Sequence, residues 1–275
     1  MELKHYWINT DKSQHRRNFM ELQFKLLGID NQRINAITPD ILSSILMDEP
    51  PFYCGNICCK YLNCRDCPFE YSCTCSHLEA IKTGYLSNEP YFIVCEDDIY
   101  FPFKINYKNL IDKLPDNFEI LQMMILDTNK YDELYKSYKD DNNLFIKFEP
   151  FKQLFSTGMY LISRQGAEKI LNIYINHESG KYELNKIPVI KQADFIIYMS
   201  VNTYTCTIPF CIPYLRFMSD IHPHHFHIHK LSIDKIIEVL NDINQNPENP
   251  LINDVIINRF NFNDFDNLYL SIMNE

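Results

Sequence analysis

Residues 91–98 read YFIVCEDD, and this stretch decides the fold. Its first five residues, Tyr91–Cys95, form a continuous apolar run of strand length, which is typical of a strand buried on both faces of a sheet. The run ends at three adjacent carboxylates, Glu96, Asp97 and Asp98. Open α/β sheets bind their ligands outside the carboxyl ends of the strands, so this position favours a ligand site.

The acidic triplet is a candidate site for a divalent cation. Side chains alternate between the two faces of a strand, so we expect Glu96 and Asp98 to point one way and Asp97 the other. Two carboxylates on one side can bind a hard cation and leave positions open for phosphate oxygens. The alternative is a solvated acidic turn after a strand. Three adjacent anions repel one another and a cation removes that cost, which favours the metal interpretation.

Strands and helices alternate around this stretch. The predicted upstream elements are strands over residues 3–8 and 33–37 and helices over residues 14–27 and 76–86. Gly28 ends the first helix, and Ser76 with Glu79 three residues later is a capping-box pattern that predicts the start of the second. This alternation indicates an α/β fold whose parallel strands are covered on both faces.

The remainder of the chain is less regular. The predicted elements are strands over residues 118–125 and 155–163, helices over 165–175, 193–201 and 232–240, and a β-prone stretch over 204–215. Residues 244–250 are typical of a linker. We expect one domain over residues 1–230, with an insertion at about residues 50–75, and a short helical extension over residues 231–275.

The composition excludes some classes of partner. The chain has 275 residues, a formal net charge of −10 and no basic stripe, which argues against a protein that grips nucleic acid through its phosphates. No apolar stretch of about 18 residues occurs, and the N-terminus lacks the pattern of a signal peptide. A cytoplasmic location without a membrane span is therefore the expectation.

Seven of the ten cysteines fall between residues 50 and 75. Cys64 and Cys67 have the spacing of zinc ligands, and Cys54 and Cys58 come close to it. A thiolate-bound Zn²⁺ could stabilise an insertion that has no core of its own. Disulfides, in an oxidising compartment, and free thiols are the alternatives.

Four blocks of sequence together resemble a known family. In chain order they are residues 7–17 (WINTDKSQHRR), 75–78 (CSHL), 94–99 (VCEDDI) and 158–169 (GMYLISRQGAEK). The chain resembles glycosyltransferase family 25, which includes bacterial lipooligosaccharide galactosyltransferases and collagen galactosyltransferases. The resemblance spans about residues 5–221. The cysteine-rich stretch is a departure from the family pattern and puts the acceptor in doubt.

The resemblance implies a GT-A-type, Rossmann-like mixed sheet flanked by helices. It also implies an inverting, Mn²⁺-dependent enzyme that moves a hexose, galactose or glucose, from a UDP-sugar to a hydroxyl of a glycan or hydroxylated protein. Glu96 and Asp98 would hold the Mn²⁺ and stabilise charge on the leaving group. The resemblance also suggests that Asp97 contacts the donor.

The resemblance also suggests residues that contact the donor and the acceptor. Asn9 and Arg17 would meet the nucleotide, although Arg17 could equally be a solvated helix charge. Ser76 and His77 are expected at a helix N-terminus, where backbone amides favour anions; His77 could instead be a packing residue.

An inverting displacement needs a base for the acceptor hydroxyl. Asp194 is the first candidate, because it falls where the family has a late acidic residue. Asp220 and Asp127 are the next, and a capping or surface role is the alternative for each.

Residues 222–229 (HPHHFHIH) are a second candidate metal feature. In many GT-A enzymes a late histidine completes the manganese shell, so His225 or His227 could join Glu96 and Asp98. A solvated polar loop is the alternative. A zinc or iron hydrolase is a weaker hypothesis, because the histidines lack the helical spacing with an adjacent acid.

Two other functions compete with transfer. One is a catalytically inactive scaffold of the same fold whose cysteine-rich module binds a partner. The other is a nucleotidyltransferase or hydrolase that uses the same carboxylates, for which a second base or ligand set is missing. The intact acidic triplet favours the transferase.

Overall fold

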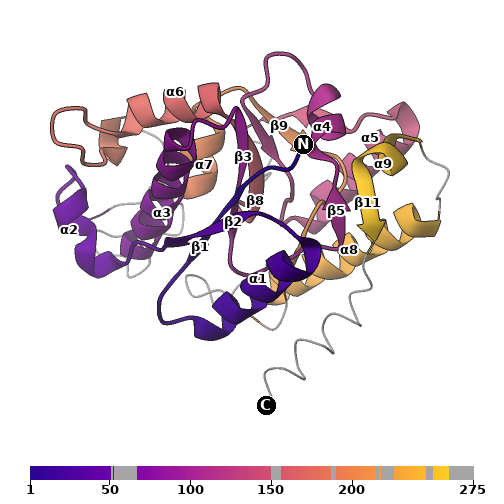
Figure 1. Cartoon of the computed structure of the whole chain (residues 1–275), viewed down its shortest axis with the longest axis horizontal. Coiled ribbons are helices and arrows are strands. Elements are labelled where there is room, and N and C mark those ends of the chain that lie inside the picture. The colour runs from indigo at the N-terminus through magenta and orange to yellow at the C-terminus, as the bar shows by residue number, and fades with distance from the viewer. Residues whose placement is uncertain are drawn as a thin grey trace.

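A computed structural model describes residues 1–50, 52, 67–149, 156–186, 190–214, 217, 226–245 and 250–259. A seven-stranded mixed sheet forms its centre, with the strand order β2-β1-β3-β8-β6-β9-β7, and helices flank the sheet (Figure 1). The strands are β1 (His5–Asn9), β2 (Asn31–Asn35), β3 (Tyr91–Glu96), β6 (Ile120–Gln122), β7 (Phe145–Lys147), β8 (Met159–Ser163) and β9 (Thr203–Cys206). The expected fold class, a mixed α/β sheet with flanking helices, is confirmed.

The first half of the sheet follows the predicted pattern. β1 pairs in parallel with β2 on one side and with β3 on the other. Helix α1 (Gln14–Leu27) connects β1 to β2, and helix α3 (Cys67–Leu86) precedes β3. The chain leaves β1 in one direction and returns past it in the other, so right-handed crossovers place α1 and α3 on opposite faces. Figure 1 shows these two helices on the two sides of β1 and β2.

The second half of the sheet is not all parallel. β8 is antiparallel to both β3 and β6, β6 is parallel to β9, and β7 is antiparallel to β9. The predicted strands at 118–125 and 155–163 are shorter, at residues 120–122 and 159–163. A continuous apolar run indicates that a strand is buried on both faces, but it does not indicate the direction of the strand. The antiparallel pairing of β8 could therefore not be predicted from the sequence.

The helix predicted from Ser76 begins nine residues earlier, at Cys67. Ser76 caps nothing: its hydroxyl donates to the Ser72 carbonyl and accepts from the Ile37 amide. Pro68 stands in the first turn of the true helix, a position where proline is favoured because its missing amide would have no helical partner. Cys67, Cys73 and Cys75, which were predicted to lie in a cysteine-rich insertion, therefore belong to α3, and the insertion itself stays a prediction.

Several elements had no counterpart in the prediction. They are η1 (Pro39–Ile41), α2 (Leu42–Ile45), β4 (Ile99–Tyr100), β5 (Phe103–Ile105), α4 (Tyr107–Asp112), α5 (Thr128–Asp141), β7 (Phe145–Lys147), η2 (Leu184–Lys186), α9 (Pro250–Val255) and β11 (Ile256–Arg259). α5 is the longest of them. It buries Tyr131, Leu134, Tyr135 and Tyr138, an amphipathic pattern carried mainly by tyrosines.

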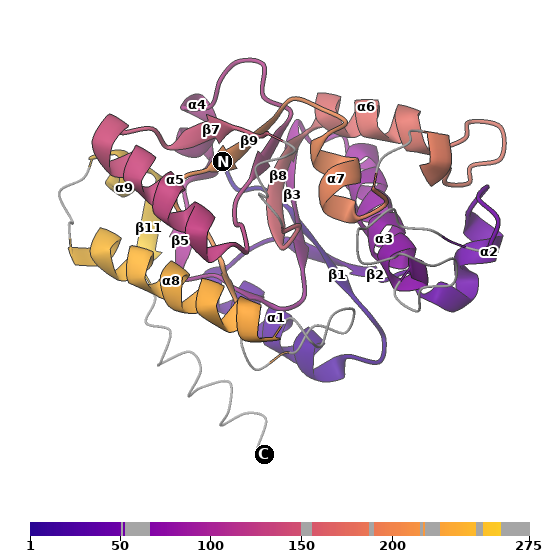
Figure 2. The same cartoon turned by 180° about the vertical axis from the view of Figure 1, so that it is seen from behind.

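The last helices pack onto the same body. Helix α6 (Arg164–Tyr174) and helix α7 (Ala193–Tyr198) confirm two predicted helices and lie against α3. β10 (Ile212–Pro213) pairs with β4, and α8 (Phe226–Gln245) lies beside α5, as Figure 2 shows. α8 crosses the boundary proposed at residue 230, and that division of domains stays a prediction. No helix in the described ranges is long and apolar enough to cross a membrane.

Candidate functional site

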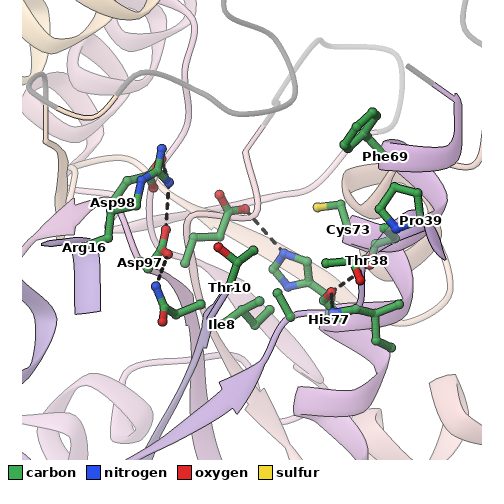
Figure 3. Close-up of a pocket in the computed structure, with 16 residues that line it drawn as sticks. Ile8, Thr10, Arg16, Thr38, Pro39, Phe69, Cys73, His77, Asp97 and Asp98 are labelled. Carbon is green, nitrogen blue, oxygen red and sulfur yellow. Dashed lines mark hydrogen bonds and ion pairs between the residues drawn. The ribbon is translucent and has the colours of Figure 1, made fainter. Parts of the chain in front are cut away.

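A pocket of about 200 Å³ opens at the carboxyl ends of the parallel strands (Figure 3). Asn9 ends β1, Ala36 and Ile37 follow β2, and Glu96 ends β3, so three neighbouring strands bring these residues to one edge. α3 closes one side through its first three turns. The remaining lining residues are Ile8, Thr10, Arg16, Thr38, Pro39, Phe69, Ser72, Cys73, Ser76, His77, Asp97 and Asp98.

The pocket has two chemically different ends. Figure 3 shows Arg16, Asp97 and Asp98 at one end and Pro39, Phe69 and Cys73 at the other. Phe69 is a large apolar side chain that remains 39% exposed. The pocket therefore combines carboxylates and one arginine at one end with an apolar, partly aromatic surface at the other.

Asp97 is held from two sides. Its Oδ1 accepts from Arg16 Nη1 at 2.8 Å, and its Oδ2 accepts from Asn9 Nδ2 at 2.6 Å. Burial raises the pKa of Asp97, and the contacts with Arg16 and Asn9 oppose that rise. Arg16 also lies 3.6 Å from Asp98 Oδ2. The guanidinium of Arg16 therefore forms ion pairs with two of the three carboxylates, Asp97 and Asp98.

Glu96 points away from this pair, towards α3. Its Oε1 accepts from Thr157 Oγ1 at 2.8 Å and lies 3.4 Å from His77 Nε2. Burial raises the pKa of Glu96, but its contacts with His77 and Thr157 and the charge of Arg16 outweigh burial and leave the pKa lowered. Glu96 is therefore ionised at neutral pH.

The expected alternation of the triplet is wrong. Asp97 and Asp98 share Arg16, whereas Glu96 turns towards His77. The strand ends at Glu96 and residues 97–98 form a turn, so the period of two stops where the triplet begins. All three carboxylates still line the pocket.

Arg16, rather than Arg17, is the arginine at the site. Arg17 is exposed and pairs with Glu21 one helical turn away, at 2.7 Å. The buried positions of α1 are 16, 19, 20, 23, 24 and 27, a single face with helical spacing. One helical turn towards the N-terminus from the apolar residues Phe19 and Met20 lies residue 16, so the helical spacing of the apolar residues already indicated Arg16.

Ser76 and His77 line the pocket from the middle of α3, not from its N-terminus. Their amides are hydrogen-bonded within the helix and cannot bind an anion, so the expected anion-binding amides are absent here. His77 is almost fully buried, and its Nδ1 lies 3.2 Å from the Tyr160 hydroxyl. Its contribution to the site is the side chain that faces Glu96.

Asp194 lies in the first turn of α7, close enough to Glu96 to sense its charge. Burial raises the pKa of Asp194 to about 7; Glu96 and Glu70 act in the same direction, while the hydrogen bond from the Ser156 amide opposes it. The Ser156 amide donates to Asp194 Oδ1 at 2.9 Å. A carboxylate with this pKa can take up a proton near neutral pH.

The other predicted site residues fall elsewhere. Asp127 is the N-cap of α5: its side chain accepts from the Lys130 amide at 3.0 Å, and it does not line the pocket. Cys67 is buried at the start of α3. The backbone of His227 lies in α8. Outside the described residues lie Asp220, His225, Cys54, Cys58 and Cys64.

The described residues fit a cation that is shared with a substrate. In the described ranges, no three His, Cys, Asp or Glu side chains are grouped so as to hold a metal by themselves. A cation that also binds nucleotide phosphates needs only one or two carboxylates. Among the lining residues in the described part of the chain, three carboxylates face a single arginine and no lysine, so the pocket attracts cations.

Open α/β sheets bind their ligands outside the carboxyl ends of their strands, and the pocket lies at such a place. The match to known proteins identifies the family: the family model of glycosyltransferase family 25, described as an LPS biosynthesis protein, covers residues 2–184. The chain belongs to this family. Glycosyl transfer requires a sugar donor and an acceptor.

Two further comparisons add little. No curated protein sequence matches this chain significantly. The crystal structure of mouse xyloside xylosyltransferase 1, in its apo form, superposes with a TM-score of 0.33 and 8% identity, over 72% of this chain and 81% of that one. A TM-score this low does not support a shared function.

Proposed function

We propose that this protein is an inverting glycosyltransferase that moves a hexose from a UDP-sugar to a hydroxyl group of a glycan or a hydroxylated protein. The observation that carries the proposal is a pair of carboxylates, Glu96 in the pocket and Asp194 close enough to Glu96 to sense its charge. Glu96 has a lowered pKa, whereas burial raises the pKa of Asp194 to about 7. Opposite shifts in neighbouring carboxylates are typical of a division between an electrostatic role and an acid–base role.

In the proposed reaction the acceptor oxygen attacks the anomeric carbon of the donor. A bond forms between that oxygen and the carbon, and the bond from the carbon to the diphosphate oxygen breaks. The acceptor proton goes to Asp194. Because the attack and the departure occur on opposite faces of the sugar, the configuration inverts.

The acidic end of the pocket suits the diphosphate only if a cation accompanies it. Three carboxylates would repel the phosphates, and Arg16 already pairs with two of the three. We propose that Glu96 and Asp98 hold a divalent ion, Mn²⁺ in the first instance, which would neutralise charge on the leaving diphosphate. Pro39 and Phe69, at the opposite end, would then pack against the base.

The test is a panel of UDP-sugars with Mn²⁺, in which hydrolysis and transfer are followed together, with calorimetry of UDP binding. Mn²⁺ should strengthen UDP binding about tenfold or more over EDTA, and Asp98→Ala should abolish that gain. Asp112→Ala, which removes an exposed carboxylate of α4, is the matched control and should behave as the unchanged protein. Equal UDP affinity in Mn²⁺ and EDTA would refute the metal assignment, and UDP binding without any transfer would favour the inactive scaffold.

Structural zinc in the cysteine-rich segment stays a separate hypothesis. It would involve Cys54, Cys58, Cys64 and Cys67, of which the structure describes only the last. Elemental analysis at about one Zn²⁺ per chain supports the hypothesis, whereas a mass lower by two hydrogens per cysteine pair supports disulfides.

A further inference from the structure

The segment Ser156-Thr157-Gly158, here called the strap, runs along the site just before β8. The Glu96 amide donates to the Gly158 carbonyl at 3.0 Å, which continues the pairing of β3 with β8 beyond the strands. The strap therefore lies beside the point where β3 gives way to the acidic triplet. Two consecutive strap residues each hold one of the two carboxylates of the proposed mechanism.

The first contact fixes Glu96. Thr157 is buried, and its hydroxyl donates to Oε1 of Glu96, the same oxygen that faces His77. None of the hydrogen bonds among the described residues reaches Oε2. Two neighbours on one oxygen set the rotation of the carboxylate and leave the other oxygen for a ligand.

The second contact fixes Asp194 through the Ser156 amide. The backbone of Ser156 has φ +132°, a conformation that residues other than glycine rarely adopt. Its carbonyl accepts from Gln122 Nε2 at 3.1 Å and from the Tyr198 hydroxyl at 2.9 Å, and its hydroxyl accepts from the Gly158 amide at 3.0 Å. A strained residue persists only where its surroundings hold it, and such residues gather at functional sites.

Gly158 adds a steric constraint. A Cβ at this position would lie 2.4 Å from Met124 Cε and 3.2 Å from the Ser156 hydroxyl. The strap therefore contacts the loop after β6 through Gly158, and it is hydrogen-bonded to β6 through Gln122 and to α7 through Asp194 and Tyr198. Its position relative to Glu96 and Asp194 is fixed from both sides.

We propose that Thr157 is a positioning residue that orients Glu96 for the donor complex and, through the adjacent Ser156 amide, keeps Asp194 in register with it. This inference rests on the proposed function and deepens it. The donor-binding carboxylate and the base are then held by one rigid segment, so that the acceptor proton and the leaving diphosphate are placed relative to each other before substrates bind.

The test compares Thr157→Val, which keeps the shape and removes the hydroxyl, with Thr157→Ser, which keeps the hydroxyl. UDP binding is measured by calorimetry with Mn²⁺ and with EDTA, and transfer by kcat and KM. Thr157→Val should lose about tenfold or more of the Mn²⁺-dependent UDP affinity and of kcat, as is usual when a residue that orients a metal ligand is removed. Its UDP affinity in EDTA should not change, and Thr157→Ser should stay within about threefold of the unchanged protein.

Thr83→Val is the matched control, because Thr83 donates from α3 to the Glu79 carbonyl away from the pocket. It should leave both measurements unchanged. If Thr157→Val equals the unchanged protein, or if the Val and Ser variants lose affinity equally together with a lower Tm, the positioning role is overturned while the proposed function stands. If the unchanged protein shows no Mn²⁺-dependent UDP binding, the proposed function fails and this inference fails with it.

Discussion

At the scale of single residues, the site separates two carboxylates by their neighbours. Glu96 has Thr157 and His77 on one oxygen and Arg16 nearby, and its pKa is lowered. Asp194 accepts a hydrogen bond from the Ser156 amide, and burial together with the nearby acids Glu96 and Glu70 raises its pKa to about 7. The sequence placed both residues at the site, but only the fold supplies these neighbours, and so the direction of each shift could not be predicted from the sequence.

Asp194→Asn should lower the rate of transfer about 10²–10⁴-fold, because the amide keeps the shape of the side chain but cannot accept the acceptor proton. The dissociation constant of UDP with Mn²⁺ should change little, since Asp194 is not among the residues that line the donor pocket. In the unchanged protein, kcat/KM should fall as the pH drops below about 7. Near-normal transfer by the Asn variant would remove Asp194 from the role and pass the test to Asp220.

The same substitution should raise stability, and the effect has a definite pH window. The folded state keeps the Asp194 proton up to about pH 7, whereas an unfolded aspartate loses it near pH 3.9. Between these values the folded state binds more protons, so the free energy of unfolding decreases as pH rises. Asn has no such dependence, and the Tm of the variant relative to the unchanged protein should therefore increase from pH 4 to pH 7.

At the scale of elements, the spacing of apolar residues along a helix determined which helices, and which buried faces, could be predicted from the sequence. α1 was predicted with its bounds correct and with Gly28 as its end, and Gly28 takes the left-handed conformation at φ +63°. The spacing of the buried residues in α1 would have been enough to place Arg16, rather than Arg17, at the pocket. α5 was missed because its buried stripe is mainly tyrosine among lysines and aspartates, a composition that resembles a polar loop.

Arg16→Gln should destabilise the protein by about 3–5 kcal/mol, because it leaves the buried Asp97 without its cation. Arg17→Gln, one residue along the same helix, breaks only an exposed pair and should stay within about 0.5 kcal/mol of the unchanged protein. Urea unfolding measures both. Adding Asp97→Asn to Arg16→Gln should restore part of the loss. Equal effects of the two arginine substitutions would show that the phase assigned to α1 is wrong.

At the scale of the whole molecule, the pocket collects residues from β1, α1, the end of β2, α3 and the end of β3, and the strap adds residues just before β8. The blocks at residues 7–17, 75–78, 94–99 and 158–169 carried the resemblance to the family, and the fold brings their Asn9, His77, Glu96 and Gly158 to one edge of the sheet. What the sequence could not supply was the pairing that joins them, above all the antiparallel β8, which carries the strap to Glu96.

The sequence predicted a helical extension over residues 231–275, but residues 256–259 form a strand that returns to the body of the protein. β11 pairs antiparallel with β5, and Asp254 forms an ion pair with Lys113 at 2.8 Å. Ile256 is buried, whereas its neighbour Ile257 is 41% exposed. This alternation is what a strand with one covered face requires, and it offers a substitution and its control side by side.

Ile256→Ala should therefore lower stability by about 2–5 kcal/mol, because it leaves a cavity where the last described strand meets β5. For a chain of this size the Tm should fall by about 2–4 °C per kcal/mol. Ile257→Ala removes a side chain that faces solvent and should shift the free energy of unfolding by no more than about 0.5 kcal/mol. Both variants should bind UDP with Mn²⁺ as the unchanged protein does, since neither residue lines the pocket. Equal Tm values for the two variants would mean that β11 does not pack on β5 in solution, and a loss of UDP affinity in Ile256→Ala alone would mean that this packing extends its influence to the pocket.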